Sequence, residues 1–239
     1  MADIKKPIIN SIKDMVEKIP GWSPIDQLYS IFLLSYSTSD LEGDFIEVGS
    51  WCGRSANVLG LAAKLSGNCK VYCVDLFPEE DDWMENSDGT YSLNVKINDG
   101  RIKSYVEQTV WKEPFEKDIA PIYEKYNGIY DAFVKFVDMN GLNDVVCPIK
   151  GESSSLKENV PRDFKCKFAF IDGDHSYNGV CRDIENIEEY LVPGGWICFD
   201  DAFSSYEGVN KAIEDKIINS GNYTCCQQLT RKFFVGKKI

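Results

Sequence analysis

The fold of this chain can be read outward from the stretch Asp44-Phe-Ile-Glu-Val-Gly-Ser-Trp-Cys-Gly-Arg-Ser-Ala56. This stretch predicts a short apolar strand, a turn that contains Gly49 and Gly53, and the start of a helix. Neither glycine has a Cβ, so a ligand can approach the backbone closely at the turn. The next strand-like run, Val71-Tyr-Cys-Val-Asp75, ends in a carboxylate. An acid at that point is placed to accept hydrogen bonds from a ribose diol, which predicts an adenosine-type ligand.

Strands and helices alternate along the chain from residue 44 onward, which is typical of a parallel sheet with helices on both faces. The final segment holds two β-rich runs, and these predict a closing hairpin. We therefore expect an α/β fold: a Rossmann-like, doubly wound, mostly parallel seven-stranded sheet with a C-terminal antiparallel hairpin, within one domain over 1–239. The expected strands are 44–49, 70–75, 144–149, 167–172, 195–200, 223–228 and 232–235, and the expected helices are 54–66, 124–140, 178–191 and 205–219.

Two segments lie outside this alternation. Residues 1–40 predict an N-terminal helical cap, in which a first helix breaks at Gly21-Trp22 and a second begins at Ser23-Pro-Ile-Asp26 with Ser23 as its cap. Residues 78–122 form an insertion after the second strand, which is long for a compact domain. We expect a partly helical lid or acceptor-binding element there; the alternative is a peripheral decoration without substrate contact.

The composition narrows the class of partner. The chain has 239 residues and a net charge of -12, which argues against nucleic acid or an anionic membrane and favours a small-molecule substrate. No apolar run is long enough to cross a bilayer, and no signal peptide is evident. The nine cysteines are scattered and only one histidine is present, which favours reduced thiols in the cytoplasm over a structural zinc site. The N-terminal helices could cover the active site or pair in a homo-oligomer.

Three acids follow two neighbouring strands of the expected sheet. Asp172 ends one strand, and Asp200 and Asp201 end another. Converging carboxylates repel one another and favour a cation such as Mg²⁺. The alternative is that Asp-Asp is a solvated turn; Asp174 is either a further ligand or a cap of its turn. His175 could take a proton from an activated hydroxyl, or it could be structural.

These residues resemble class I S-adenosylmethionine-dependent methyltransferases. The resemblance rests on Ile19-Pro-Gly-Trp-Ser-Pro24, Glu47-Val-Gly-Ser-Trp-Cys-Gly-Arg-Ser55, Asp172-Gly-Asp-His-Ser-Tyr177 and Val192-Pro-Gly-Gly195, and it covers most of the chain. The glycine loop is also similar to that of catechol O-methyltransferase, whose metal ligands have the spacing of Asp172, Asp200 and Asp201. Metal-dependent sugar O-methyltransferases have a similar acidic triad with a histidine at the position of His175.

The resemblance implies a cofactor site and a metal site. It assigns the metal to Asp172, Asp200 and Asp201, catalysis to His175 and Asp172, and S-adenosylmethionine contacts to Glu47, Gly49, Gly53, Ser55, Asp75, Glu152, Ser153 and Asp172. Ser55 would hold the carboxylate of the methionine part, with a helix cap as the alternative, and Asp75 would hold the ribose hydroxyls. Glu152 and Ser153 would lie nearest the adenine.

The function expected on this basis is methyl transfer from S-adenosylmethionine to a hydroxyl of a small molecule, such as a sugar, a phenol or a natural-product intermediate, with help from Mg²⁺. Three alternatives stay open. They are a metal-independent methyltransferase on the same fold, a nicotinamide-dependent oxidoreductase, and a cofactor-binding protein that has lost catalysis.

Overall fold

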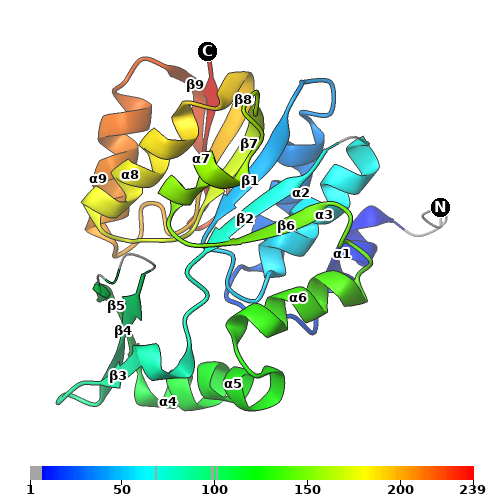
Figure 1. Ribbon diagram of the computed structural model, residues 1–239. Helices are drawn as coiled ribbons and strands as arrows, with labels where there is room; N and C mark the ends of the chain where they lie inside the picture. Colours follow the sequence, from blue (N-terminus) through cyan, green and yellow to red (C-terminus); the bar gives the residue numbers. More distant parts are fainter. Residues whose placement is uncertain (1–6, 68, 98–99, 101) are drawn as a thin grey trace.

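The computed structural model describes residues 7–67, 69–97, 100 and 102–239 (Figure 1). Its main sheet has seven strands in the order β6-β2-β1-β7-β8-β10-β9, and the first five are parallel to one another. The last two strands pair antiparallel and close one edge of the sheet. The strands are β1 (Asp44–Val48), β2 (Val71–Asp75), β6 (Val146–Lys150), β7 (Cys166–Ile171), β8 (Leu191–Phe199), β9 (Tyr223–Gln228) and β10 (Phe234–Lys238). The predicted Rossmann-like sheet with its C-terminal hairpin is confirmed.

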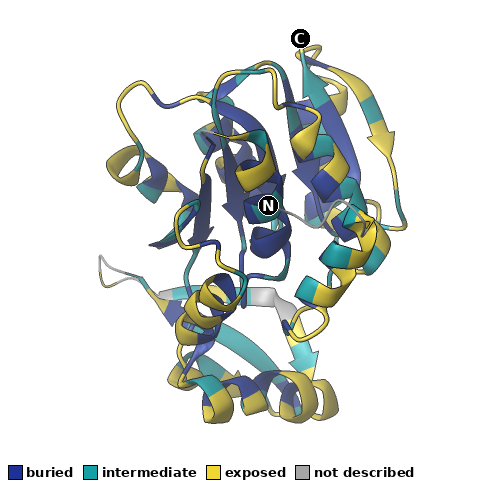
Figure 2. Cartoon of the chain, turned by 90° about the vertical axis from the view of Figure 1, so that its right-hand side faces the viewer, coloured by how far each residue is buried: buried dark blue, intermediate teal, exposed yellow. Residues whose placement is uncertain are grey.

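Helices cover both faces of this sheet (Figure 1). One buried cluster joins the sheet to α1 (Ile8–Val16), α2 (Ile25–Tyr36), α3 (Arg54–Ser66) and α6 (Ile129–Met139). The other joins it to α7 (Leu156–Asn159), α8 (Tyr177–Glu188) and α9 (Glu207–Ile213). Along β1, Phe45 belongs to the first cluster and Ile46 to the second, because successive strand residues point to opposite faces. The sheet interior is accordingly the most buried part of the molecule (Figure 2).

The helical boundaries differ from the prediction at two places. The expected helix over 124–140 is two helices, α5 (Ala120–Tyr126) and α6, because Asn127 and Gly128 both have positive φ values, 62° and 131°. The second N-terminal helix begins at Ile25 after Pro24, and Ser23 does not cap it. The first helix is described from Ile8, and residues 1–6 of the predicted cap lie outside the described residues.

The insertion after β2 is richer in strand than the sequence predicted. It contains a three-stranded antiparallel sheet of β3 (Trp83–Glu85), β4 (Thr90–Lys96) and β5 (Ile102–Trp111). A helical stretch that begins with α4 (Lys112–Pro114) and ends with α5 follows. Together they form a lobe beside the carboxyl edge of the main sheet (Figure 1). Among the described residues, no helix combines the length and apolar character that a membrane span requires.

Candidate active site

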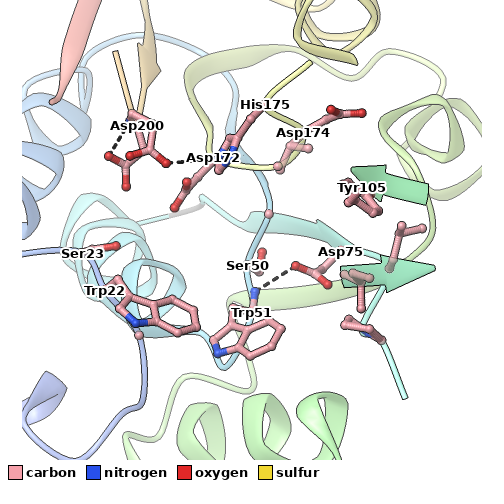
Figure 3. Close-up of a pocket in the computed structure, with 18 of the residues that line it drawn as sticks. Trp22, Ser23, Ser50, Trp51, Asp75, Tyr105, Asp172, Asp174, His175 and Asp200 are labelled. Carbon is pink, nitrogen blue, oxygen red and sulfur yellow. Dashed lines mark hydrogen bonds and ion pairs between the residues drawn. The ribbon is translucent and has the colours of Figure 1, made fainter. Parts of the chain in front are cut away.

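A cavity of about 530 Å³ opens at the carboxyl ends of β1, β2, β7 and β8. The strand order reverses at β1, which lies between β2 and β7, and ligands of open α/β sheets bind at such a switch point. The N-terminal cap and the insertion complete the walls (Figure 3). The lining residues from these two segments include Pro20, Gly21, Trp22 and Ser23, and Trp83, Leu93, Lys103, Tyr105, Val110 and Trp111.

Gly49 brings the turn after β1 against the end of β7. Its φ is +87°, and a Cβ at this position would lie 2.0 Å from the carbonyl oxygen of Asp172. Glycine is therefore required both by the backbone conformation and by the close approach. In addition, the Asp172 N–H donates to the Val48 carbonyl oxygen at 2.8 Å, and this hydrogen bond helps to fix the position of the acid.

Asp75 is held by the backbone of two neighbouring turns. Its Oδ2 accepts from the Trp51 N–H at 2.9 Å (Figure 3). Its Oδ1 accepts from the Phe77 N–H at 2.6 Å. Trp51 and Phe77 have φ values of 46° and 45°, which is uncommon for non-glycine residues and concentrates at functional sites. Each carboxylate oxygen keeps a lone pair, so the acid can still accept from a ligand diol.

The resemblance assigned Ser55 and Glu47 to the part of the site that would hold the methionine portion of the cofactor. Ser55 lines the cavity, and it does not cap α3, because the N-cap residue is Gly53. Glu47 is fully buried behind the wall, and Gly53 also does not line the cavity. Ser50, Ser55 and Cys73 surround the Glu47 carboxylate, but neither oxygen has a partner of good hydrogen-bond geometry. Burial raises the pKa of Glu47 to about 7, against the smaller lowering effect of the nearby hydroxyls.

The loop after β6 and helix α8 line the opposite end of the cavity. Glu152 and Ser153 both line the cavity there, as does Asp183 of α8. The Ser153 hydroxyl donates to Asp183 at 2.6 Å and accepts from the Asn186 amide at 2.9 Å. Burial raises the pKa of Asp183 to about 6. The sequence analysis missed Asp183, although its place on the apolar face of α8, beside Val180 and Ile184, was a detectable signal.

The three predicted acids all line one rim of the cavity, where Figure 3 shows Asp172 and Asp200 beside His175. Burial, and then the charges of Asp200 and Asp201, raise the pKa of Asp172 well above its ordinary value. A cation that the sequence analysis missed lies among them. The Lys232 ammonium contacts Asp201 at 2.9 Å and Asp200 at 3.3 Å. Burial alone would lower the pKa of Lys232, but Asp200 and Asp201 raise it.

His175 forms a pair with one of these acids. Its Nε2 lies 3.1 Å from Asp201 Oδ2, and its ring centroid is 4.0 Å from that of Tyr206. The Nδ1 atom is buried and has no hydrogen-bond partner. A histidine that donates from Nε2 to a carboxylate has its lone pair on Nδ1. Asp174 caps the turn, accepting from the Ser176 N–H at 2.8 Å.

The donor set at the rim fits a divalent cation. One ligand atom each from Asp172, His175 and Asp201 lies within 4.8 Å of the others. Asp200 stands beside this group, with its Oδ1 accepting from the Asp201 N–H at 2.7 Å. Carboxylate oxygens suit Mg²⁺ or Mn²⁺, whereas an imidazole ligand suits softer metals. The structure thus adds His175 to the candidate ligands that the sequence predicted.

Aromatic side chains form the wall opposite the acids. Trp22 from the cap and Trp83 from the insertion both contact Trp51, with ring centroids 5.6 Å and 6.4 Å away. Arg54 holds the cap in place, because its guanidinium donates to the carbonyl oxygens of Val16, Ile19 and Ser23 at 2.6, 2.9 and 3.2 Å. An elongated ligand between Asp75 and Asp172 would therefore have a flat apolar surface beside it.

A mostly parallel sheet in this strand order, with an acid at the end of β2 and a glycine turn after β1, is the arrangement expected of a class I methyltransferase. Residues 46–202 match the family described as methyltransferase domain. The chain belongs to this family and is an S-adenosylmethionine-dependent methyltransferase. This membership favours methyl transfer over the nicotinamide-dependent alternative.

Similar solved structures agree with this fold. The O-methyltransferase NovP has a TM-score of 0.59 and 15% identity, over 90% of this chain and 80% of that one. An O-methyltransferase from Bacillus cereus in complex with SAH has a TM-score of 0.58 and 15% identity, over 99% and 94%. The calicheamicin methyltransferase CalS11 has a TM-score of 0.58 and 15% identity, over 96% and 90%.

Proposed function

We propose that this protein transfers a methyl group from S-adenosylmethionine to a hydroxyl of a small molecule, with assistance from a divalent cation. The observation that carries the proposal is the position of the His175–Asp201 pair. Its ion-pair partner atoms lie 3.1 Å apart, beside Asp172, in the cavity that also contains Asp75. The candidate proton acceptor and the candidate ribose-binding acid thus line the same cavity.

The cofactor would lie along the switch point of the sheet. Asp75 would accept from the ribose hydroxyls, because both of its oxygens are already oriented by backbone N–H groups. Ser55 would donate to the carboxylate of the methionine part, and Gly49 allows close approach there. Glu152 and Ser153 would flank the adenine. Glu47 and Gly53 do not line the cavity, so neither would contact the cofactor directly.

His175 would act as the general base. The Asp201 carboxylate lies 3.1 Å from Nε2 and orients the imidazole, which would take the hydroxyl proton when the acceptor is bound. The acceptor oxygen forms a bond to the methyl carbon as the bond from that carbon to sulfur breaks, and the proton passes to His175. Much of the rate would come from holding the two reacting atoms in line.

Mg²⁺ or Mn²⁺ would be held by Asp172 and Asp201, with Asp200 adjacent, and would lower the pKa of the acceptor hydroxyl. Lys232 favours a second candidate, the metal-independent methyltransferase. Its ammonium already lies within 3.3 Å of both Asp200 and Asp201, so these two acids have a counter-ion within the chain. In that case Lys232 and His175 would orient the acceptor hydroxyl without a metal.

A hydroxylated small molecule fits the space beside the acids. Trp22, Trp51 and Trp83 offer apolar faces that suit sugar rings and phenols alike. Similar structures include enzymes described as O-methyltransferases, among them a TDP-rhamnose 3'-O-methyltransferase. These descriptions support a hydroxyl as the acceptor group.

The test separates cofactor binding from chemistry. SAH binding is measured by isothermal titration for Asp172→Asn, His175→Gln and Asp75→Ala, and SAH production is measured with catechol and TDP-rhamnose as acceptors. We expect Asp75→Ala to lose SAH binding. The other two variants should keep it within about threefold but lose turnover by about 10²-fold or more. Loss of SAH binding in Asp172→Asn would contradict the proposed role of Asp172 as a metal ligand and favour the direct cofactor contact instead.

The metal is tested in the same assay. EDTA should suppress turnover, and Mg²⁺ or Mn²⁺ should restore it. Full activity in EDTA would favour the metal-independent candidate. Binding of Mn²⁺, followed by its EPR signal, separates the two roles of His175: binding that survives His175→Gln identifies a base, and binding that is lost identifies a ligand.

A further inference from the structure

Strand β5 of the insertion lies against the nucleoside end of the cavity. Lys103 and Tyr105 both line the cavity, and residues two apart on a strand point to the same side. The Lys103 Nζ lies 3.4 Å from Glu152 Oε1 and 3.2 Å from Asp174 Oδ2. These two acids belong to the loops after β6 and β7, so one lysine of the insertion joins two loops of the core.

Lys103 is unusually enclosed for a lysine. Its side chain is 19% exposed, and those of Glu152 and Asp174 are 24% and 10% exposed. Ion pairs at this depth are screened less than surface pairs, so they hold a position more firmly. Lys103 also lies 4.9 Å from the centroid of the Tyr105 ring, which is within the range of a cation–π contact.

Tyr105 is surrounded by the acids of the nucleoside end. Burial, and then the charges of Asp174, Asp75, Asp183 and Glu152, raise the pKa of its phenol. The hydroxyl is therefore a proton donor, and Tyr105 lies on the same side of the cavity as Asp75 (Figure 3). A nucleoside held by Asp75 and the loop after β6 would have Tyr105 next to it.

We propose that β5 forms the outer wall of the nucleoside site, and that Lys103 fastens this wall to the core through Glu152 and Asp174. The inference rests on the cofactor site proposed above. With this wall closed, the cofactor lies between the main sheet and the insertion. Exchange of SAH for S-adenosylmethionine then requires the two Lys103 ion pairs to open, which makes Lys103 a positioning residue for cofactor retention.

The experiment compares two lysines of the insertion. Lys112 is 54% exposed and pairs with Glu85 and Glu116, both within the insertion. SAH dissociation is followed by stopped flow in the wild type, Lys103→Met and Lys112→Met. We expect Lys103→Met to release SAH about three- to tenfold faster, which is the scale of one or two partly buried ion pairs. Lys112→Met should match the wild type.

Two further measurements separate fastening from general stability. The wild-type dissociation rate should rise with NaCl concentration, and this dependence should be reduced in Lys103→Met. A double-mutant cycle of Lys103→Met with Asp174→Asn should show coupling in the dissociation rate, because the two groups form one ion pair. Tyr105→Ala should weaken SAH binding more than Tyr105→Phe, since the phenylalanine ring keeps the wall.

Each outcome decides between the proposals. Equal dissociation rates in the wild type and Lys103→Met, or equal acceleration in both lysine variants, would overturn the fastening role while leaving the proposed function intact. Unchanged SAH affinity in Tyr105→Ala would contradict the proposal that β5 forms a wall of the nucleoside site. If the wild type does not bind SAH at all, the proposed function fails instead.

Discussion

At the residue scale, the site depends on one glycine that allows two strand ends to touch. We expect Gly49→Ala to destabilise the protein by more than about 4 kcal/mol, because the new Cβ would overlap the Asp172 carbonyl. Gly67→Ala is the matched control: its φ is also positive, at +69°, but nothing lies within 4 Å of the added carbon. The unfolding free energy of that variant should fall by only about 1–2 kcal/mol. Similar losses of unfolding free energy in urea for both variants would contradict the contact.

The raised pKa of Glu47 leads us to expect that the unfolding free energy depends on pH. Its pKa is raised from 4.5 to about 7 in the folded protein, so the folded state binds more protons between these values and loses stability as pH rises through them. Glu47→Gln removes this loss. Relative to the wild type, we expect its unfolding free energy to increase by roughly 3 kcal/mol from pH 4.5 to pH 8.

The control for Glu47 is a glutamate at the surface. Glu42 is 79% exposed and pairs with Lys165, so Glu42→Gln makes the same substitution outside the core and is the reference for Glu47→Gln. Urea unfolding at several pH values measures both variants. A difference for Glu47→Gln that does not change with pH would show that the buried carboxyl titrates normally.

At the element scale, the sequence predicts the parts that local patterns determine. The strands of the main sheet and α3 follow from apolar runs and the glycine turn, and their positions agree with the structure within a few residues. The insertion was expected to be partly helical, but its strands pair with one another across turns, and pairing of that kind leaves a weak local pattern. The break of the 124–140 helix depended on the left-handed conformation of Asn127.

The same division applies to the candidate site. The acids at 172, 200 and 201 could be placed together because parallel strands end at one edge. The sequence could not place Lys103 and Lys232 at the site, because each lysine comes from an element whose position is determined by tertiary packing. Lys232 lies between β9 and β10, far along the chain from the acid at 172, and nothing local distinguishes it from Arg231 beside it.

Helix α3 also fixes the N-terminal cap through Arg54, whose guanidinium donates to three carbonyl oxygens of that segment. We expect Arg54→Met to increase amide hydrogen exchange over residues 8–24 and to raise the acceptor KM, because Trp22 and Ser23 line the cavity. Lys64→Met is the control, since Lys64 lies on the same helix but donates to Gly141. Unchanged exchange over 8–24 in Arg54→Met would show that packing alone holds the cap.

At the scale of the whole molecule, the distribution of charge affects how tightly a cation binds to the acids at the rim of the cavity. The chain has a net charge of -12, which attracts divalent cations generally, while Lys232 of the C-terminal hairpin neutralises part of the acid cluster. Lys232 would therefore compete with a bound ion for Asp200 and Asp201. Two segments far apart in the sequence would together determine the metal affinity.

This competition can be measured without turnover. We expect Lys232→Gln to bind Mn²⁺ about tenfold more tightly than the wild type at low salt, as followed by EPR, because one opposing charge is removed beside the ligands. Its melting temperature should also rise more on adding Mn²⁺, since tighter binding to the folded state stabilises it further. Arg231→Gln is the control: Arg231 is exposed in the same turn and does not line the cavity, so its affinity should stay near that of the wild type. Weaker Mn²⁺ binding in Lys232→Gln would instead show that the lysine orders the carboxylates, and no binding by any of the three proteins would remove the metal from the proposed reaction.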